Sequence, residues 1–178
     1  MSLKIYQEKR QFDHTPEPAP NEGKASNPQP VFVVQKHAAS RLHFDFRLEA
    51  SGVLKSWAVP KGPSMNPKDK RLAVQVEDHP LSYADFKGVI PEGNYGAGTV
   101  EIWDKGTYTY VGKYADIEEG LERGILEFEL QGHQLQGLFD LIRTEMDKKK
   151  NDWLLIKKND SFAVHHKYEA ENIRSFLI

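Results

Sequence analysis

The chain has 178 residues and a mass of 20.4 kDa, the size of one domain. Lysine and arginine number 24 and aspartate and glutamate 26, so the net charge is -2, which excludes the bulk basicity of a DNA-coating protein. Cysteine is absent, which excludes a disulfide scaffold, a thiolate zinc site, an iron–sulfur cluster and a cysteine nucleophile. No apolar run approaches the ~20 residues of a membrane span, so we expect a soluble, cytoplasmic protein with no membrane partner.

Proline is concentrated near the N-terminus, above all in residues 15–20 and 28–30. Proline at this density disfavours helix and sheet and favours an extended segment. We therefore expect three parts along the chain: an N-terminal arm (residues 1–30), a folded domain (31–160) and a C-terminal tail (161–178) that is helical over 167–177.

Short β-type runs separated by glycine, proline and aspartate follow the arm. One helix is expected at Ala115–Arg123, where Asp116 can cap the start and Gly124 stands just past the end. Many short strands at close spacing favour a mainly β fold, a closed or nearly closed antiparallel barrel with one or two short flanking helices. The expected strands are 31–36, 42–49, 53–59, 71–77, 98–103, 107–111, 124–130, 135–143 and 151–158, with residues 104–106 as a hairpin turn.

The strand expected at 42–49 has two different faces. Its even-numbered residues are apolar, while His43, Asp45 and Arg47 share the other face with about 7 Å between neighbours. Two imidazoles, His37 and His43, and one carboxylate within nine residues match a ligand set for manganese, iron or zinc. His37 reaches the same ion only if the chain bends sharply before His43. Arg47 adds a fixed cation whose fork geometry suits phosphate.

Three other interpretations stay open at this point. The polar face of this strand can be an ordinary solvated surface. Two histidines and one aspartate also form the facial triad of non-haem Fe(II) oxygenases, and a DNA-end-binding module without catalysis fits as well. Residues 36–71 carry eight basic and three acidic side chains, a local positive excess that favours a phosphate-containing ligand. The glycine-rich residues 91–98 lack the Lys-Ser/Thr ending of a P-loop and indicate a structural turn.

Long strings of the sequence resemble the 3′-phosphoesterase domain of bacterial DNA ligase D and its stand-alone relatives. The resemblance implies a β-barrel with an active-site groove and a manganese-dependent enzyme that acts on the 3′ ends of DNA primer–templates. Such enzymes remove a terminal ribonucleoside to leave a 3′-phosphate, and then remove that phosphate to leave a 3′-OH. We expect a monomer that works beside a separate ligase, polymerase and end-binding proteins. The matching strings are 32–39, 42–49, 54–63, 71–74, 76–81, 83–86, 88–93, 95–100 and 153–157.

The resemblance also implies roles for individual residues of this chain. His37, His43 and Asp45 would hold the manganese ion. Arg47 and a protonated His79 would hold the scissile phosphate. The further active-site residues that it implies are Lys61, Arg71 and Tyr83.

The arm of the family carries the pattern Arg-Asp-Phe followed by Thr-x-Glu. Arg10 and Glu17 of this chain match that pattern, and the resemblance implies that both reach the active site, so residues 10–17 should be docked there. Gln11 departs from it, because it stands where the family has aspartate. The family's arm residues matter mainly for removing the ribonucleoside, so the departure bears on that step more than on removal of the phosphate.

Overall fold

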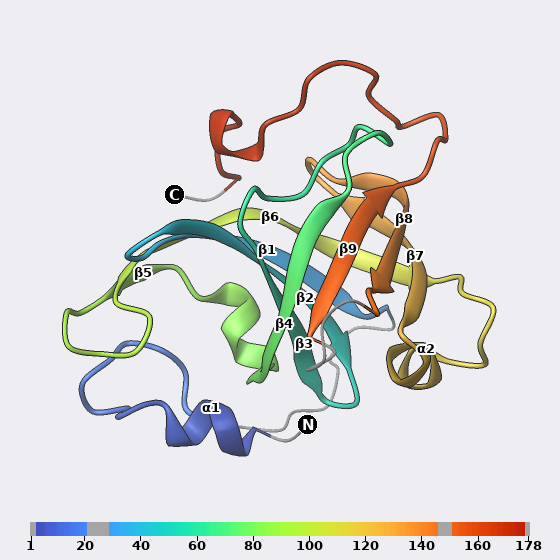
Figure 1. Cartoon of the computed structure of the whole chain (residues 1–178). Coiled ribbons are helices and arrows are strands. Elements are labelled where there is room, and N and C mark those ends of the chain that lie inside the picture. Colours follow the sequence, from blue (N-terminus) through green and yellow to red (C-terminus); the bar gives the residue numbers. More distant parts are fainter. Residues whose placement is uncertain (1–2, 21–28, 146–150, 177–178) are drawn as a thin grey trace.

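The computed structural model describes residues 3–20, 29–145 and 151–176 (Figure 1). Eight antiparallel strands close into a barrel in the order β1-β2-β3-β4-β9-β8-β7-β6, with β6 pairing back to β1. This confirms the expected mainly β, closed antiparallel barrel with short helices beside it. The strands are β1 (Val31–Ala38), β2 (Leu42–Ala50), β3 (Val53–Val59), β4 (Arg71–Pro80), β5 (Gly88–Ile90), β6 (Gly98–Tyr110), β7 (Ile125–Gly132), β8 (Gln136–Arg143) and β9 (Asp152–Lys157); the helices are α1 (Lys4–Glu8) and α2 (Ile117–Arg123), and the 3₁₀ helices η1 (Leu81–Asp85) and η2 (Ala170–Asn172).

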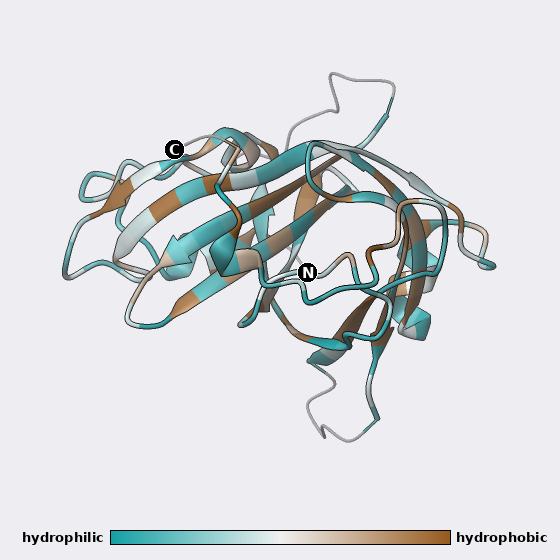
Figure 2. Cartoon of the chain, turned by 90° about the horizontal axis from the view of Figure 1, so that it is seen from above, coloured by the Kyte–Doolittle hydropathy of each residue, from teal (hydrophilic) through white to brown (hydrophobic). Residues whose placement is uncertain are grey.

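Large apolar side chains fill the interior of the barrel. The alternation of β2 places Phe44, Phe46 and Leu48 inside, where Phe46 packs against Trp57 and Phe128. Bands of apolar and polar residues alternate along the strands in Figure 2. Burying each such side chain contributes about 1.5–3 kcal/mol, so the interior is a packed core and a ligand must bind elsewhere.

A second apolar cluster covers the outer face of one part of the barrel wall. It joins Val33 of β1 to Tyr6 of α1 and to Tyr83 and Phe86, which lie in and directly after η1. The amide of the buried Gln35 fixes this layer, because its Nε2 donates to the carbonyl oxygens of Tyr83 (2.8 Å) and Phe86 (3.0 Å). Strand β1 is thus covered on both faces, and the polar residues of its outer face lie beside an apolar layer.

The hairpin expected between residues 98 and 111 is wrong. Strand β6 runs through that region without a turn, and Gly106 pairs with Phe32 on one side and Gly132 on the other. Asp104 does not bend its own backbone, because its buried carboxylate accepts hydrogen bonds from the backbone N–H groups of residues 133–135. The carboxylate of Asp104 therefore stabilises the loop between β7 and β8 and forms no turn in its own strand.

The helix expected over residues 167–177 is also wrong, because the described part of the tail contains only the three-residue η2. The tail's carbonyl groups bind barrel side chains: Arg71 donates to Tyr168 O (2.6 Å), and Trp103 donates to Ala170 O (3.2 Å) and Ile173 O (3.1 Å). These contacts replace the hydrogen bonds of a helix. The tail and the N-terminal segment lie on opposite sides of the barrel (Figure 1).

Helix α2 lies where the sequence predicts it. Asp116 caps its first turn by accepting from Glu119 N (2.9 Å), and Gly124 ends it with a left-handed conformation, φ 79°. Helix α1 and strand β5 were not among the expected elements. No helix in the described part of the chain is long and apolar enough to cross a membrane.

Candidate active site

The hairpin of β1 and β2 brings the two candidate histidine ligands together. His37 and His43 stand directly opposite each other in the register, and their ring centroids lie 4.8 Å apart. Asp45 lies next to both: its Oδ2 is 3.4 Å from His37 Nδ1 and its Oδ1 is 3.3 Å from His43 Nε2. One ligand atom from each of the three residues lies within 4.8 Å of the others. The turn at residues 39–41 supplies the bend that the sequence requires.

Backbone carbonyl groups fix the orientation of both imidazole rings. His37 Nε2 donates to Gly96 O at 2.6 Å, and His43 Nδ1 donates to Arg41 O at 3.1 Å. Each ring therefore turns its other nitrogen toward Asp45. A carbonyl on the remote nitrogen of each ligating histidine is the usual arrangement in metal sites. Two imidazoles and one carboxylate, oriented in this way, fit a divalent first-row metal ion.

Charge keeps Asp45 ready to bind a cation. Burial alone would raise the pKa of its carboxyl group, but the charge of Arg47 and the hydrogen bonds from His37 and His43 lower that pKa well below its usual value. The carboxylate is therefore ionised at neutral pH. Burial lowers the pKa of His43, but the contact with Asp45 raises it, and the net effect is a raised pKa. A metal ion that binds His43 must therefore displace a proton more often than at a free imidazole.

Arg47 has a donor without an acceptor in the described part of the chain. Its Nε donates to Gln35 Oε1 at 2.8 Å, and its Nη2 lies 3.4 Å from Asp45 Oδ2. Its Nη1 is buried and has no hydrogen-bond partner. A buried donor that lacks an acceptor costs about 1–3 kcal/mol, and an anion in the adjacent cavity would remove that cost.

His79 lies in the same site, and its surroundings determine its charge. Burial, and next the positive charges of Arg47 and Arg10, lower the pKa of His79 well below its usual value. The ring is therefore neutral in the free protein, and a protonated His79 beside a bound phosphate stays a prediction. Its Nδ1 donates to Glu77 O at 2.9 Å, which leaves the Nε2 lone pair directed at Arg10 Nη2, 3.4 Å away.

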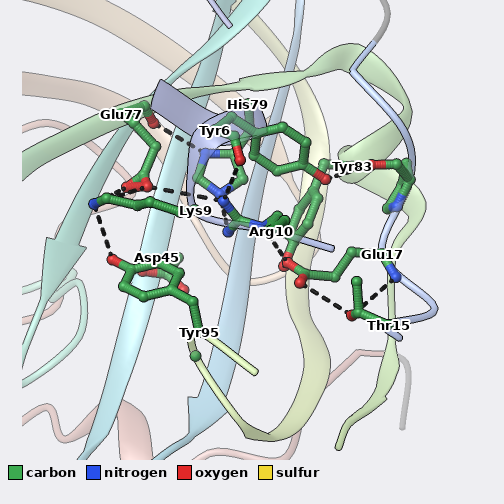
Figure 3. A network of polar contacts seen from close by, with 12 residues as sticks. Tyr6, Lys9, Arg10, Thr15, Glu17, Asp45, Glu77, His79, Tyr83 and Tyr95 are labelled. Carbon is green, nitrogen blue, oxygen red and sulfur yellow. Dashed lines mark hydrogen bonds and ion pairs between the residues drawn. The ribbon is translucent and has the colours of Figure 1, made fainter. Parts of the chain in front are cut away.

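The N-terminal arm supplies a buried network beside these groups (Figure 3). Glu17 Oε2 accepts from Arg10 Nε at 2.9 Å and from the Tyr83 hydroxyl at 2.7 Å, and Glu17 Oε1 accepts from the Thr15 hydroxyl at 3.1 Å. Burial raises the pKa of Tyr83 well above its usual value, so the phenol keeps its proton and remains a donor. This network ties residues 10–17 to η1 and to the barrel wall.

One cavity of about 540 Å³ collects most of the residues that the resemblance points to. The sequence points to ten candidate site residues. Eight of them line this cavity: Arg10, Glu17, His37, His43, Asp45, Arg47, His79 and Tyr83.

Two of the ten do not line that cavity. Lys61 is exposed after the end of β3, in a separate hollow that it shares with Glu169 and Glu171 of the tail. Arg71 lies beside Asp69 and donates to the tail through Tyr168 O. The tail thus holds Arg71 away from the cavity, and the catalytic roles of Lys61 and Arg71 stay predictions of the resemblance.

Several cavity residues lie outside the set named from the sequence. Glu77 is two residues before His79 on β4; it is buried and forms ion pairs with Lys9 (3.3 Å) and Arg10 (3.9 Å). Its period-two spacing from His79 is a signal that places both on one face. Tyr95 and Gly96 also line the cavity, so the glycine-rich turn has a role beyond connecting strands. Their approach to β1 is a tertiary contact with no local signal.

Gln11 is exposed and lies outside the lining of the cavity. It faces a neighbouring polar hollow together with Lys9, His14 and Tyr95. The departure of this position from the family pattern is therefore located at the edge of the site.

Comparison with known proteins identifies the family of this chain. The family model of the DNA Ligase D 3′-phosphoesterase domain matches residues 35–143. A multifunctional non-homologous end joining protein LigD from Pseudomonas aeruginosa is 54% identical over 162 residues, 90% of this chain and 19% of that protein. The multifunctional non-homologous end joining DNA repair protein LigD of Mycobacterium tuberculosis is 46% identical over 82% of this chain and 19% of its own length. The chain thus spans about a fifth of these relatives. It belongs to the DNA ligase D 3′-phosphoesterase domain family.

Proposed function

We propose that this chain is a manganese-dependent phosphoesterase that heals DNA 3′ ends during non-homologous end joining. Its substrates would be a 3′-terminal ribonucleoside, a 3′-phosphate or both, and its product a 3′-OH that a ligase can join. The proposal rests on one observation: the buried Nη1 of Arg47, which has no partner among the residues that the structure describes, lies beside the cluster of His37, His43 and Asp45 in one cavity. An anion receptor next to a cation site is what a phosphate ester requires.

A divalent metal ion held by His37, His43 and Asp45 would supply Lewis-acid stabilisation of the phosphoryl group. Arg47 would bind the non-bridging oxygens through its free N–H group, and its bonds to Gln35 and Asp45 fix the guanidinium in place before the substrate arrives.

His79 would handle a proton, because its neutral ring presents an unprotonated Nε2 toward Arg10 and the cavity. In the free protein that nitrogen faces the Arg10 donor, so it would take a proton from an attacking water molecule only where a bound phosphate draws Arg10 away. Tyr83 would be a positioning residue, because its hydroxyl donates a hydrogen bond to Glu17 and so holds the arm over the site. The arm thereby excludes water from one side of the reacting phosphate.

Two other classes of function compete with this proposal. An Fe(II) oxygenase would use the same three ligands, and the free donor of Arg47 would suit the carboxylate of its keto acid, so these groups alone do not separate the two enzymes. A DNA-end-binding module without catalysis would not need three ligands oriented by carbonyl groups. Membership of a phosphoesterase family supports the enzyme over both alternatives.

The direct experiment is an end-processing assay. Labelled primer–templates that end in one ribonucleotide or in a 3′-phosphate are incubated with manganese and with wild type or His43→Ala. We expect the wild type to convert both ends to a 3′-OH and the variant to convert neither. Conversion of the 3′-phosphate alone would limit the proposal to the phosphatase step and connect the missing step to Gln11.

Binding of either end without turnover, at saturating manganese, would refute the catalytic proposal in favour of the binding module. Turnover that needs Fe(II) and a keto acid and releases no phosphate would favour the oxygenase.

A further inference from the structure

An exposed aromatic side chain stands at the rim of the cavity and has no part in the proposed chemistry. Tyr95 lines the cavity, yet it is 49% exposed. The next residue, Gly96, accepts the hydrogen bond from His37, so the ring is one residue away from a direct contact with the candidate metal site. The cavity volume of about 540 Å³ lies within the ~300–1,000 Å³ of small-molecule sites, and it leaves room for more than a phosphate group.

The loop that carries Tyr95 is held in position by the protein itself. Asn94 Nδ2 donates to Pro91 O at 3.0 Å within the loop and to His14 O of the arm at 3.1 Å. Lys9 Nζ donates to the Tyr95 hydroxyl at 3.3 Å. An aromatic ring that is fixed before a ligand binds loses little conformational entropy when a flat group stacks on it.

Two cationic side chains, each also paired with a carboxylate, lie beside the same ring. Lys9 Nζ lies 4.6 Å from the ring centroid and Arg10 Cζ lies 5.3 Å from it. Figure 3 shows Lys9 between Glu77 and Tyr95, with the tyrosine at the edge of the polar network. An exposed aromatic ring beside cations is the combination that binds a nucleobase attached to a phosphate backbone.

We propose that Tyr95 forms a nucleobase subsite, in which its ring stacks on the terminal base of the DNA strand whose 3′-phosphate lies at Arg47. The inference rests on the proposed function and adds a group that recognises the nucleotide itself. Every base has a flat π face, so stacking tolerates all four bases and suits an enzyme that meets ends of any sequence.

The test compares two fluorescent primer–templates with a 3′-phosphate, one ending in thymidine and one in a tetrahydrofuran residue that lacks a base. Dissociation constants are measured by anisotropy in a chelator for wild type, Tyr95→Ala and Tyr95→Phe. The control is Phe162→Ala, because Phe162 is also 49% exposed and does not line the cavity. Initial rates with manganese are measured in parallel, so a failure of the proposed function is seen separately from a failure of the subsite.

We expect Tyr95→Ala to weaken binding of the thymidine end about tenfold, or ~1.4 kcal/mol, and to leave the abasic end unchanged. Tyr95→Phe and Phe162→Ala should keep the wild-type preference for the end with a base. Equal losses on both ends would overturn the inference, as would no loss on either. A Tyr95→Phe protein that behaves like Tyr95→Ala would also overturn it, because the hydroxyl contact with Lys9 would then be what matters.

Discussion

The carbonyl oxygen of Gly96 lies 2.6 Å from Nε2 of His37, although 59 positions separate them in the chain. This single contact joins the loop between β5 and β6 to the candidate metal site on β1. It also determines which nitrogen of His37 faces Asp45, because the donating nitrogen cannot bind a metal ion at the same time.

A Gly96→Ala substitution should weaken manganese binding. Gly96 has φ +77°, where a side chain is strained, and an added Cβ would lie 3.4 Å from Cε1 of His37. A Cβ at 3.4 Å makes only an ordinary van der Waals contact, so the strained backbone is what would move the carbonyl away from the ring, and loss of such a contact typically costs 10–100-fold in metal affinity. We expect the dissociation constant for manganese, measured by isothermal titration calorimetry, to rise at least about tenfold.

The matched control for this change is Gly93→Ala. Gly93 lies in the same loop with φ +89°, but an added Cβ would have no atom within 4 Å. This variant should strain the backbone equally and bind manganese like the wild type. If both variants lost affinity to the same extent, strain of the loop rather than the carbonyl contact would explain the effect.

Replacing Arg47 by lysine should weaken recognition of the phosphate while the metal site remains. Lysine keeps the charge and has three N–H donors, but these share one nitrogen atom and cannot reproduce the planar fork whose Nε faces Gln35, whose Nη2 faces Asp45 and whose Nη1 stays free within the described residues. We expect kcat/KM for a 3′-phosphate end to fall by about 10²-fold. Manganese affinity should stay near that of the wild type. Arg123→Lys, at an exposed end of α2, is the control for the same chemical change and should have wild-type activity. An active Arg47→Lys enzyme would contradict the proposed role.

Replacing Glu17 by glutamine should release the N-terminal arm. Glu17 is buried and pairs with the buried Arg10, and the loss of one partner of such a pair costs about 3–5 kcal/mol. Hydrogen–deuterium exchange of residues 3–20 should become faster, with exchange in β1 and β2 unchanged. Glu8→Gln is the control, because Glu8 pairs with Lys4 on the surface at 3.9 Å. Unchanged exchange in the arm would show that Glu17 does not hold it.

The neutral state of His79 should make folding sensitive to pH. Burial and two arginines lower its pKa in the folded protein, while in the unfolded chain it has its usual value of about 6.5. Its contribution to stability is therefore complete above pH ~6.5 and is lost as the pH falls toward the folded pKa. Relative to His79→Gln, the wild type should lose up to about 1.4 kcal/mol of unfolding free energy per pH unit below ~6.5. Urea denaturation at pH 7.5, 6.0 and 5.0 measures this, and parallel curves for the two proteins would contradict it.

The sequence predicts the parts of the site that depend on local geometry. Alternation along β2 is enough to place His43, Asp45 and Arg47 on one face and the aromatic residues on the other. The pairing of His37 with His43 follows once β1 and β2 form a hairpin. These features need only the period of a strand and one tight turn, which are written in neighbouring residues.

The parts that the sequence does not predict are contacts between distant segments. Gly96 and Tyr95 reach the site through a loop whose glycines indicate only a turn. Asp104 looks like a turn residue but uses its carboxylate to bind another loop. The neutral charge of His79 depends on two arginines that only the folded chain brings near it. Propensity and spacing contain no information about such neighbours.

The site combines residues on strands of the closed barrel with residues on segments attached to the barrel from outside. Strand β2 cannot slip by one residue without moving Phe44 and Phe46 to the outside and Asp45 into the core, so the spacing of the metal ligands is fixed by the whole ring. The arm and the loop of Tyr95 are attached to that wall from outside, the arm through Tyr6 in the apolar layer and both through a few polar contacts. Substitutions in these attached segments can therefore change which DNA ends are accepted while the metal site stays intact, which gives such a family a route to new specificity on an unchanged framework.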